Sequence, residues 1–438
     1  MQHFSKAPAV CTHNSRRGAH SGVRSLLAIV GILLLSGAAD GRGQDPEPQD
    51  HTNSTSPSSW MLTYDGVLFA TFSHQTGPRG ADEFVSTDWL MGMAMRQAGP
   101  GLLTLTGMAS LDRATTGPQG YRELFQVGEL YHFIPITDRQ HPHDLLMQAS
   151  VAWRIPLTDK TGITFAGAPV GEPALGPVAF MHRASAAENP VAPLSHHTLD
   201  STHISMGVIT VAVDRDPWIL ESSVFQGTEP DDNRWDLMDV GPLDSWSARV
   251  TYKASDSWEL QGSHGYLKNP ESLEFASMHR TTASASWFKP GANGFTAATF
   301  AFGRNDKQFH GNFHAALVEA TRRQSVFSVY GRLEGVQVET ELLQTQGRFH
   351  SHTLVAKDLV TAGTFGGVVD LPPWKVFKML RPFEAGVGAE ATSYVVPNAL
   401  RATHGDHPLS VRVFLRIRPS AGSMGRMWNT RMAGRMRH

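Results

Sequence analysis

Residues 245–253 read Ser-Trp-Ser-Ala-Arg-Val-Thr-Tyr-Lys, a strict alternation of polar and apolar side chains. Successive side chains of a β-strand point to opposite faces, so Trp246, Ala248, Val250 and Tyr252 share one apolar face. The same pattern recurs in short runs from about residue 60 to residue 418. We therefore predict an all-β protein, a closed antiparallel transmembrane β-barrel with lipid outside and water inside.

An export signal precedes these strands. Residues 1–24 carry four basic residues and no acid, and residues 25–39 (SLLAIVGILLLSGAA) add a short apolar core that ends in small residues. This pattern is typical of a secretory signal, because a membrane-spanning helix needs about 20 apolar residues. Cys11, the only cysteine, lies within the signal. The mature chain is thus expected to have no disulfide and no thiolate chemistry.

Composition divides the remaining chain into three parts. Residues 40–59 are rich in Pro, Gln, Asp and Ser and predict a flexible periplasmic leader, residues 60–418 form the barrel, and residues 419–438 are a Met- and Arg-rich tail. Loss of residues 1–39 removes four of the 38 Lys and Arg and none of the 40 Asp and Glu. The resulting net charge near −6 does not favour a nucleic-acid partner.

Seventeen candidate strands follow one another at the spacing of an antiparallel meander. They include Tyr121–Phe133, His203–Val213 and Leu409–Ile417. A barrel with an even number of strands needs one more or one fewer, so we expect 16 or 18, and the connection 366–382 is the suspected position of the miscount. The alternative is a soluble all-β protein, in which so many polar faces would be difficult to bury.

The last candidate strand, residues 409–418 (LSVRVFLRIR), places its charges on a single face. Arg412, Arg416 and Arg418 alternate with apolar residues. A row of arginines is expected in a wet lumen rather than against lipid, so Arg412 and Arg416 are candidate pore residues.

With its signal, its strand pattern and its missing cysteines, the chain resembles bacterial outer-membrane β-barrels of the porin-like kind. The resemblance implies a place in the outer membrane of a Gram-negative-type bacterium, in contact with its lipid and lipopolysaccharide. It also implies a channel or transport barrel for small solutes or ions. The chain departs from the pattern by continuing past Arg418, because such chains commonly finish on the aromatic end of their last strand. A surface receptor or adhesin without an open pore is an alternative.

Connection lengths alternate between short and long, which gathers the long loops on one rim, the extracellular rim in outer-membrane barrels. The long connection Pro169–Thr202 is expected to be disordered or functional. If it folds inward, it narrows the lumen; as a surface loop it only shields the strands. The candidate constriction residues of this loop are His182, Arg183, Glu188 and His196.

Eighteen of the 21 histidines lie beyond the signal, many of them in long connections of the same rim. His141 and His143 flank Pro142, which favours an extended backbone, so both rings can lie on the same side of the chain. Imidazoles beside a carboxylate suit Zn, Cu or Ni, although a channel requires no cofactor. The alternative is an exposed loop whose Asp144 caps the next strand. The candidate metal ligands are His141, His143, Asp144, His196 and His197.

Three methionines, Met91, Met93 and Met95, share one face of a candidate strand. We expect them to face lipid, and a copper path through soft thioether ligands is the alternative.

An enzymatic alternative rests on Thr202–Gly207 (THISMG). On a strand, His203 and Ser205 would share a face, and the imidazole would activate the hydroxyl as a nucleophile. The pair resembles the His-x-Ser of outer-membrane phospholipases and lipid A deacylases, which implies a lipid hydrolase. Those motifs carry Asn directly after the Ser, whereas this chain has Met206. We favour a channel without a catalytic cycle.

Overall fold

The computed structural model describes residues 59–270, 276–348, 355–372 and 383–420. The expected signal (1–39), leader (40–59) and tail (419–438) lie outside the described residues except at their innermost positions. They remain predictions.

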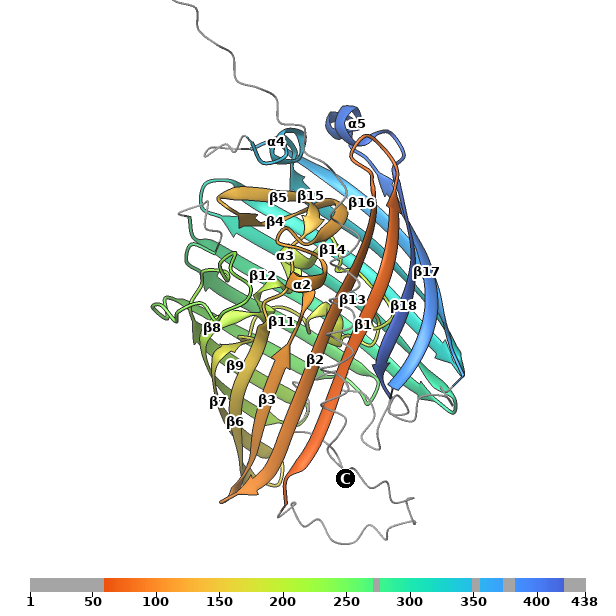
Figure 1. Ribbon diagram of the computed structural model, residues 1–438. Helices are drawn as coiled ribbons and strands as arrows, with labels where there is room; N and C mark the ends of the chain where they lie inside the picture. The colour runs from red at the N-terminus through yellow and green to blue at the C-terminus, as the bar shows by residue number, and fades with distance from the viewer. Residues whose placement is uncertain (1–58, 271–275, 349–354, 373–382, 421–438) are drawn as a thin grey trace, which may run out of the picture. The chain divides into compact units, whose positions relative to one another are not determined.

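Sixteen strands form a closed barrel in which every neighbouring pair is antiparallel, and β1 pairs with β18 to close it (Figure 1). This confirms the predicted fold class and the lower of the two expected strand numbers. The strands of the barrel are β1 (Met61–Gln75), β2 (Asp82–Ala98), β3 (Gly101–Ala109), β6 (Leu146–Thr158), β7 (Thr161–Gly171), β8 (Ser205–Arg215), β9 (Trp218–Phe225), β10 (Ser245–Lys253), β11 (Trp258–Leu267), β12 (Met278–Gly291), β13 (Gly294–Lys307), β14 (Gly311–Gln324), β15 (Phe327–Glu339), β16 (Lys357–Asp370), β17 (Phe383–Val395) and β18 (Leu409–Pro419).

The surplus candidate strand, Tyr121–Phe133, is not part of the barrel wall. It forms β4 (Tyr121–Tyr131), which pairs only with β5 (Ile134–Gln140) in a separate two-stranded sheet. Phe125 and Glu129 have left-handed φ values of 68° and 57°, and the register shifts beside them. These breaks in the strand conformation make β4 too irregular for a continuous barrel ladder. The suspected miscount at 366–382 was wrong, because β16 simply continues to Asp370 and residues 373–382 lie outside the described part.

The alternation in β10 is confirmed by exposure. Trp246 and Val250 are 45% and 40% exposed on the outer face, whereas Ser247 and Arg249 are buried on the inner face. Apolar side chains of the other strands, such as Phe165 and Leu333, are exposed in the same way. An apolar outer band over a polar interior is the pattern of a transmembrane barrel.

Connections differ in length between the two rims. Two-residue turns join β2 to β3, β6 to β7, and β8 to β9, whereas 36 residues separate β3 from β6 and 33 separate β7 from β8. The connection between β13 and β14 on the long-connection rim is an exception, because β13 extends to Lys307 and β14 begins at Gly311, which leaves a short turn. The long-connection rim also carries α4 (Thr340–Thr345) and α5 (Asn398–His404) (Figure 1). None of the helices that the structure describes is both long and apolar enough to cross a membrane.

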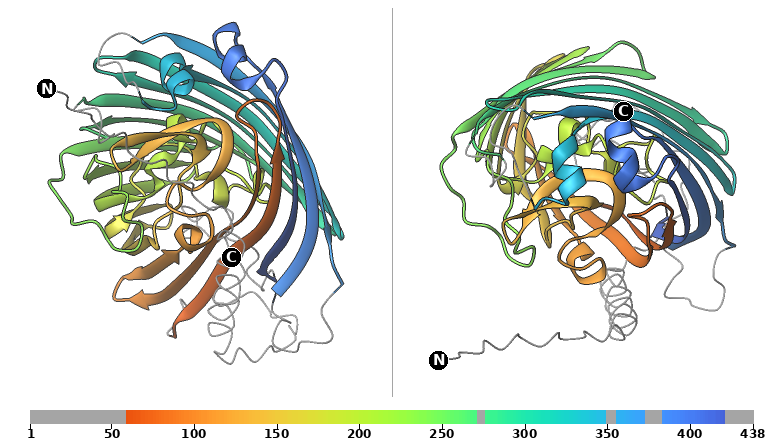
Figure 2. Two further views of the ribbon diagram at one scale, coloured as in Figure 1. Left: turned by 45° about the horizontal axis from the view of Figure 1, so that its top comes forward. Right: turned by 90° about the horizontal axis from the view of Figure 1, so that it is seen from above.

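Two long connections fold into the lumen, and the view from above shows them inside the ring of strands (Figure 2). We call residues 110–145 the first insert and residues 172–204 the second insert. The first contains α2 (Asp112–Thr115), β4 and β5; the second contains η1 (Phe180–His182), α3 (His196–Leu199) and η2 (Ser201–His203). Backbone N–H groups of the second insert donate to the wall, from Ala174 to Ser223 Oγ (2.8 Å) and from Gly176 to Ser263 Oγ (2.9 Å). The second insert is therefore anchored to the inner face of the wall.

Candidate functional site in the barrel lumen

Buried ion pairs hold the second insert to the barrel wall. Arg183 lies 2.6 Å from Glu319 of β14 and 2.6 Å from Asp200 of its own insert. Glu188 pairs with Arg416 and, at 3.1 Å, with Arg418, both on β18. Removing one partner of such a buried pair leaves an uncompensated charge, at a cost of about 3–5 kcal/mol.

The first insert is tied to the same strand. Arg412 of β18 lies 2.9 Å from Glu390 of β17 and pairs with Glu123 of β4. Tyr394 donates a hydrogen bond of 3.3 Å to Glu123. The inward arginine face of β18 was predicted, but its carboxylate partners on the inserts were not, because nothing local in the sequence pairs residues so far apart.

All six candidate pore residues lie in the lumen, and all are buried against protein partners. Arg412 and Arg416 are 1% and 0% exposed. The ring of His182 packs edge-on against Trp89 at 4.8 Å, and burial lowers the pKa of His182 to about 4. Their role in selecting solutes stays a prediction. The candidate pore residues are His182, Arg183, Glu188, His196, Arg412 and Arg416.

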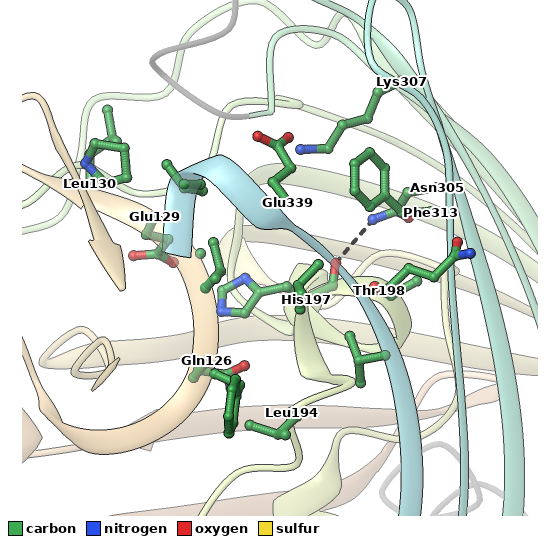
Figure 3. Close-up of a pocket in the computed structure, with 18 residues that line it drawn as sticks. Gln126, Glu129, Leu130, Leu194, His197, Thr198, Asn305, Lys307, Phe313 and Glu339 are labelled. Atoms are coloured by element: carbon green, nitrogen blue, oxygen red, sulfur yellow. Dashed lines mark hydrogen bonds between the residues drawn. The ribbon is translucent and has the colours of Figure 1, made fainter. Parts of the chain in front are cut away.

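Several cavities adjoin the inserts. One of about 240 Å³ lies against the inner faces of β2, β3 and β6 to β10, with Arg154, Asp214 and Arg249 in its lining. Another of about 240 Å³ lies beside the turn between β10 and β11 and reaches Arg183. A third, of about 100 Å³, lies between β4 and strands β13 to β15, and His197 lines it (Figure 3).

Five histidines from the two inserts meet in the lumen, and we call them the histidine pentad. Ring centroids lie 5.2 Å apart for His141–His197, His196–His197 and His196–His203, and 5.5 Å apart for His143–His203. His196 is central, because its ring also lies 6.4 Å from that of His141. The pentad consists of His141, His143, His196, His197 and His203.

In four members of the pentad, His141, His143, His196 and His203, Nδ1 contacts an oxygen acceptor. Nδ1 of His143 lies 2.7 Å from Asp112 Oδ2, and Nδ1 of His196 lies 2.7 Å from Asp200 Oδ1. Nδ1 of His203 lies 2.9 Å from the carbonyl oxygen of Asp200. These contacts occupy the Nδ1 side of the three rings.

Electrostatics keep most of the pentad uncharged. Burial, followed by the neighbouring histidines, lowers the pKa of His141, His197 and His203 well below the ordinary value. Burial also lowers the pKa of His196, despite its hydrogen bond to Asp200. Neutral imidazole is the form that binds metal ions.

Four of the five predicted metal ligands belong to the pentad, and Asp144 does not. Its carboxylate accepts a 3.0 Å hydrogen bond from Arg234, which also pairs with Glu129. His203 was missed because Thr202–Gly207 was read as extended. The expected strand His203–Val213 in fact begins at Ser205, and His203 ends a 3₁₀ turn. As they stand, no three His, Asp or Glu side chains of the described residues are grouped closely enough to hold a metal ion.

The expectation that Met91, Met93 and Met95 face lipid was wrong. All three are buried on the inner face of β2. Met91 packs in a cluster with Met181 of the second insert and Phe180, whose ring lies 5.3 Å from that of His196. The methionines face inward because the inserts give this part of β2 an apolar surface to pack against.

The hydrolase alternative gains no support from the geometry. Ser205 Oγ donates to the carbonyl oxygen of Thr202 at 3.0 Å, while His203 Nδ1 contacts Asp200. The two side chains therefore have other partners, and the arrangement of a base with its nucleophile is not formed.

No family model matches the chain, and no curated protein matches it in sequence. Solved porins match in structure. Pseudomonas putida OprB at high pH aligns with a TM-score of 0.51 at 10% identity, covering 83% of this chain and 94% of OprB. An anion-selective porin from Comamonas acidovorans gives 0.48 at 8%, covering 82% and 100%, and Salmonella typhi OmpF with daunomycin gives 0.46 at 9%, covering 81% and 97%.

At these identities the likeness concerns the fold. The chain is a porin-like β-barrel of the outer-membrane type, and the predicted outer-membrane location agrees with this fold.

Proposed function

We propose that the protein is a channel through which small solutes or ions cross the outer membrane, by a path that the two inserts narrow. The observation that supports this best is the cavity of about 240 Å³ against the inner faces of β2, β3 and β6 to β10, with charged side chains in its wall. A barrel that served only as a surface anchor would need no such space.

The cavity wall carries charges of both signs at fixed positions. Arg154 forms a two-pronged contact with Asp214, at 2.9 and 2.7 Å. Arg249 forms another with Glu221, at 2.6 and 2.8 Å. Paired charges along a narrow lumen select solutes by size and by charge distribution, as charged rings do in other channels.

Conductance of the purified barrel in planar lipid bilayers tests the proposal. Ala212 of β8 lines the cavity, whereas the adjacent Val211 is 41% exposed on the outer face. Ala212→Trp is expected to fill the cavity and to lower single-channel conductance several-fold. Val211→Trp adds the same side chain on the lipid side and is the matched control, with conductance unchanged.

Two results would overturn the proposal. One is a folded wild-type barrel that inserts into the bilayer without carrying current. The other is an equal loss of conductance in both tryptophan variants. That result would show that the current does not pass through the cavity.

A further inference from the structure

We propose that the histidine pentad binds a divalent transition metal ion of the Zn²⁺, Cu²⁺ and Ni²⁺ group through its Nε2 atoms. The inference goes beyond the channel, because it concerns binding at one cluster in the lumen and does not require a current.

The Nδ1 contacts define which ring nitrogen carries the proton. His143 and His196 face carboxylate oxygens through Nδ1, while His141 and His203 face backbone carbonyl oxygens of Pro142 and Asp200. Ionised carboxylates and carbonyls only accept hydrogen bonds, so Nδ1 is the donor in His143, His196 and His203, whose Nε2 atoms have no hydrogen-bond partner in the described part of the chain. The lone pair then lies on Nε2, the atom left for a metal ion.

The Nε2 atoms of the pentad are buried, and no hydrogen-bond donor among the described residues contacts them. Among the described residues, Nε2 of His143, His196, His197 and His203 has no hydrogen-bond partner. Nε2 of His141 lies 3.2 Å from Glu129 Oε1, which is itself an acceptor. Several neutral nitrogen acceptors are thus buried together without a hydrogen-bond donor. A bound cation or a water molecule would satisfy them.

The ring spacing fits a shared metal ion. A metal about 2.1 Å from each Nε2, bound at a tetrahedral angle, holds two ring centroids about 5 Å apart. Three ring pairs of the pentad have centroids 5.2 Å apart. The ring centroids therefore lie at the separation that a shared metal ion requires. Among the described residues the Nε2 atoms do not yet converge on one point, so binding requires shifts of the side chains.

Carboxylates behind the rings resemble the outer shell of histidine metal sites. Metal-bound histidines commonly donate their other N–H to a carboxylate, which fixes the ring and raises its basicity. Asp112 serves His143 in this way, and Asp200 serves His196. Imidazole ligands without a thiolate favour Zn, Cu or Ni over Mg or Ca, which prefer oxygen ligands.

A cavity leads toward the pentad. His197 lines the 100 Å³ cavity together with Glu129 and Glu339, and Figure 3 shows the three side chains around it. Lys307 lines the same cavity, so its wall carries charges of both signs. Gly128 leaves room for the His197 ring, because a Cβ there would lie 2.2 Å from its Cε1 atom.

The test uses the full-length barrel, folded in detergent, stripped with a chelator and titrated with Zn²⁺, Cu²⁺ or Mg²⁺. Bound metal is counted by elemental analysis after desalting, and affinity is measured by calorimetry. We expect at least one tightly bound Zn²⁺ or Cu²⁺ per chain and no Mg²⁺. For Cu²⁺, electron paramagnetic resonance should show hyperfine coupling to several imidazole nitrogens.

His196→Gln removes the central ring and should abolish tight binding. His279→Gln is the matched control, because His279 also belongs to a ring pair, with His264 at 5.4 Å, but is exposed on the barrel wall. Asp112→Asn keeps all five rings but removes the carboxylate that His143 contacts, and should weaken binding about 10- to 100-fold. Gly128→Ala also keeps all five rings but displaces that of His197, so it should weaken binding too.

Absence of tight binding in the folded wild-type barrel would overturn the proposal, and water would then be the occupant of the cluster. Equal binding by His196→Gln and His279→Gln would also overturn it, by assigning the metal to surface histidines. If His196→Gln does not fold, two other results test the proposal. They are weaker metal binding by Asp112→Asn and the imidazole coupling in the resonance spectrum of the wild type. All these measurements are made in detergent and need no ion current. A barrel that fails to conduct would therefore contradict the channel proposal without affecting the metal-binding proposal.

Discussion

Oδ1 of Asp200 lies 2.7 Å from Nδ1 of His196, four residues earlier in the second insert. Oδ2 of the same carboxylate lies 2.6 Å from Arg183. One buried side chain thus joins the histidine pentad to the ion pairs that hold the insert against the wall. Binding chemistry and lumen architecture are therefore coupled through this residue.

Asp200→Asn should destabilise the protein strongly. The substitution leaves Arg183 with Glu319 as its remaining charged partner, and loss of one member of a buried pair costs about 3–5 kcal/mol. Unfolding by urea in detergent measures the change in free energy. Asp256→Asn, on the exposed turn between β10 and β11, is the control and should change stability little. Equal stability of the two variants would show that the Asp200 contacts do not hold the insert.

Stability should depend on pH through Asp138 of β5. Burial raises its pKa, but hydrogen bonds from His404 and Arg79 outweigh burial and leave the pKa below its ordinary value. A lowered pKa in the folded state stabilises the protein above the unfolded pKa of about 3.9, and this contribution is lost as the pH falls further through the folded pKa.

The difference in unfolding free energy between wild type and Asp138→Asn should therefore be largest above about pH 5 and shrink below about pH 4. Urea unfolding at a series of pH values measures it. A difference that stays constant from neutral pH to pH 3 would contradict the assigned role of Asp138.

Glu188→Gln should loosen the second insert and raise single-channel conductance. Glu188 pairs with Arg416 and Arg418 and accepts a 3.1 Å hydrogen bond from Ser328. A neutral amide cannot balance the two guanidinium groups, so the insert loses its anchor on β18. Glu341→Gln, exposed on α4, is the control. Lower or unchanged conductance in a folded Glu188→Gln barrel would argue against a gating role for this anchor.

Much of the fold could be predicted because period-two alternation is a local property. Ser245–Lys253 and Leu409–Ile417 show their two faces without reference to any other segment. Alternation alone could not distinguish a wall strand from a strand inside the lumen, which is why Tyr121–Phe133 was misplaced. Phe125 and Glu129, two left-handed residues of β4, are not glycines, so their residue types did not mark the irregularity.

The candidate site was predictable only where loop topology sufficed. Long loops on one rim bring His141 and His143 near His196 and His197 whatever their detailed conformation. Asp144 was misassigned because its partner, Arg234, is 90 residues away in sequence. His203 was missed because the 3₁₀ turn that directs it into the cluster depends on packing of the insert.

The selectivity of the single channel with and without Zn²⁺ tests the central claim most directly, that a conducting porin-like barrel carries a metal site in its lumen. A divalent ion held in the pentad adds positive charge to the lumen and should shift the reversal potential toward anion selectivity. We predict this shift in wild type and in His279→Gln, and its loss in His196→Gln. A barrel that conducts with the same reversal potential before and after Zn²⁺, or that shifts equally in His196→Gln, would contradict the account.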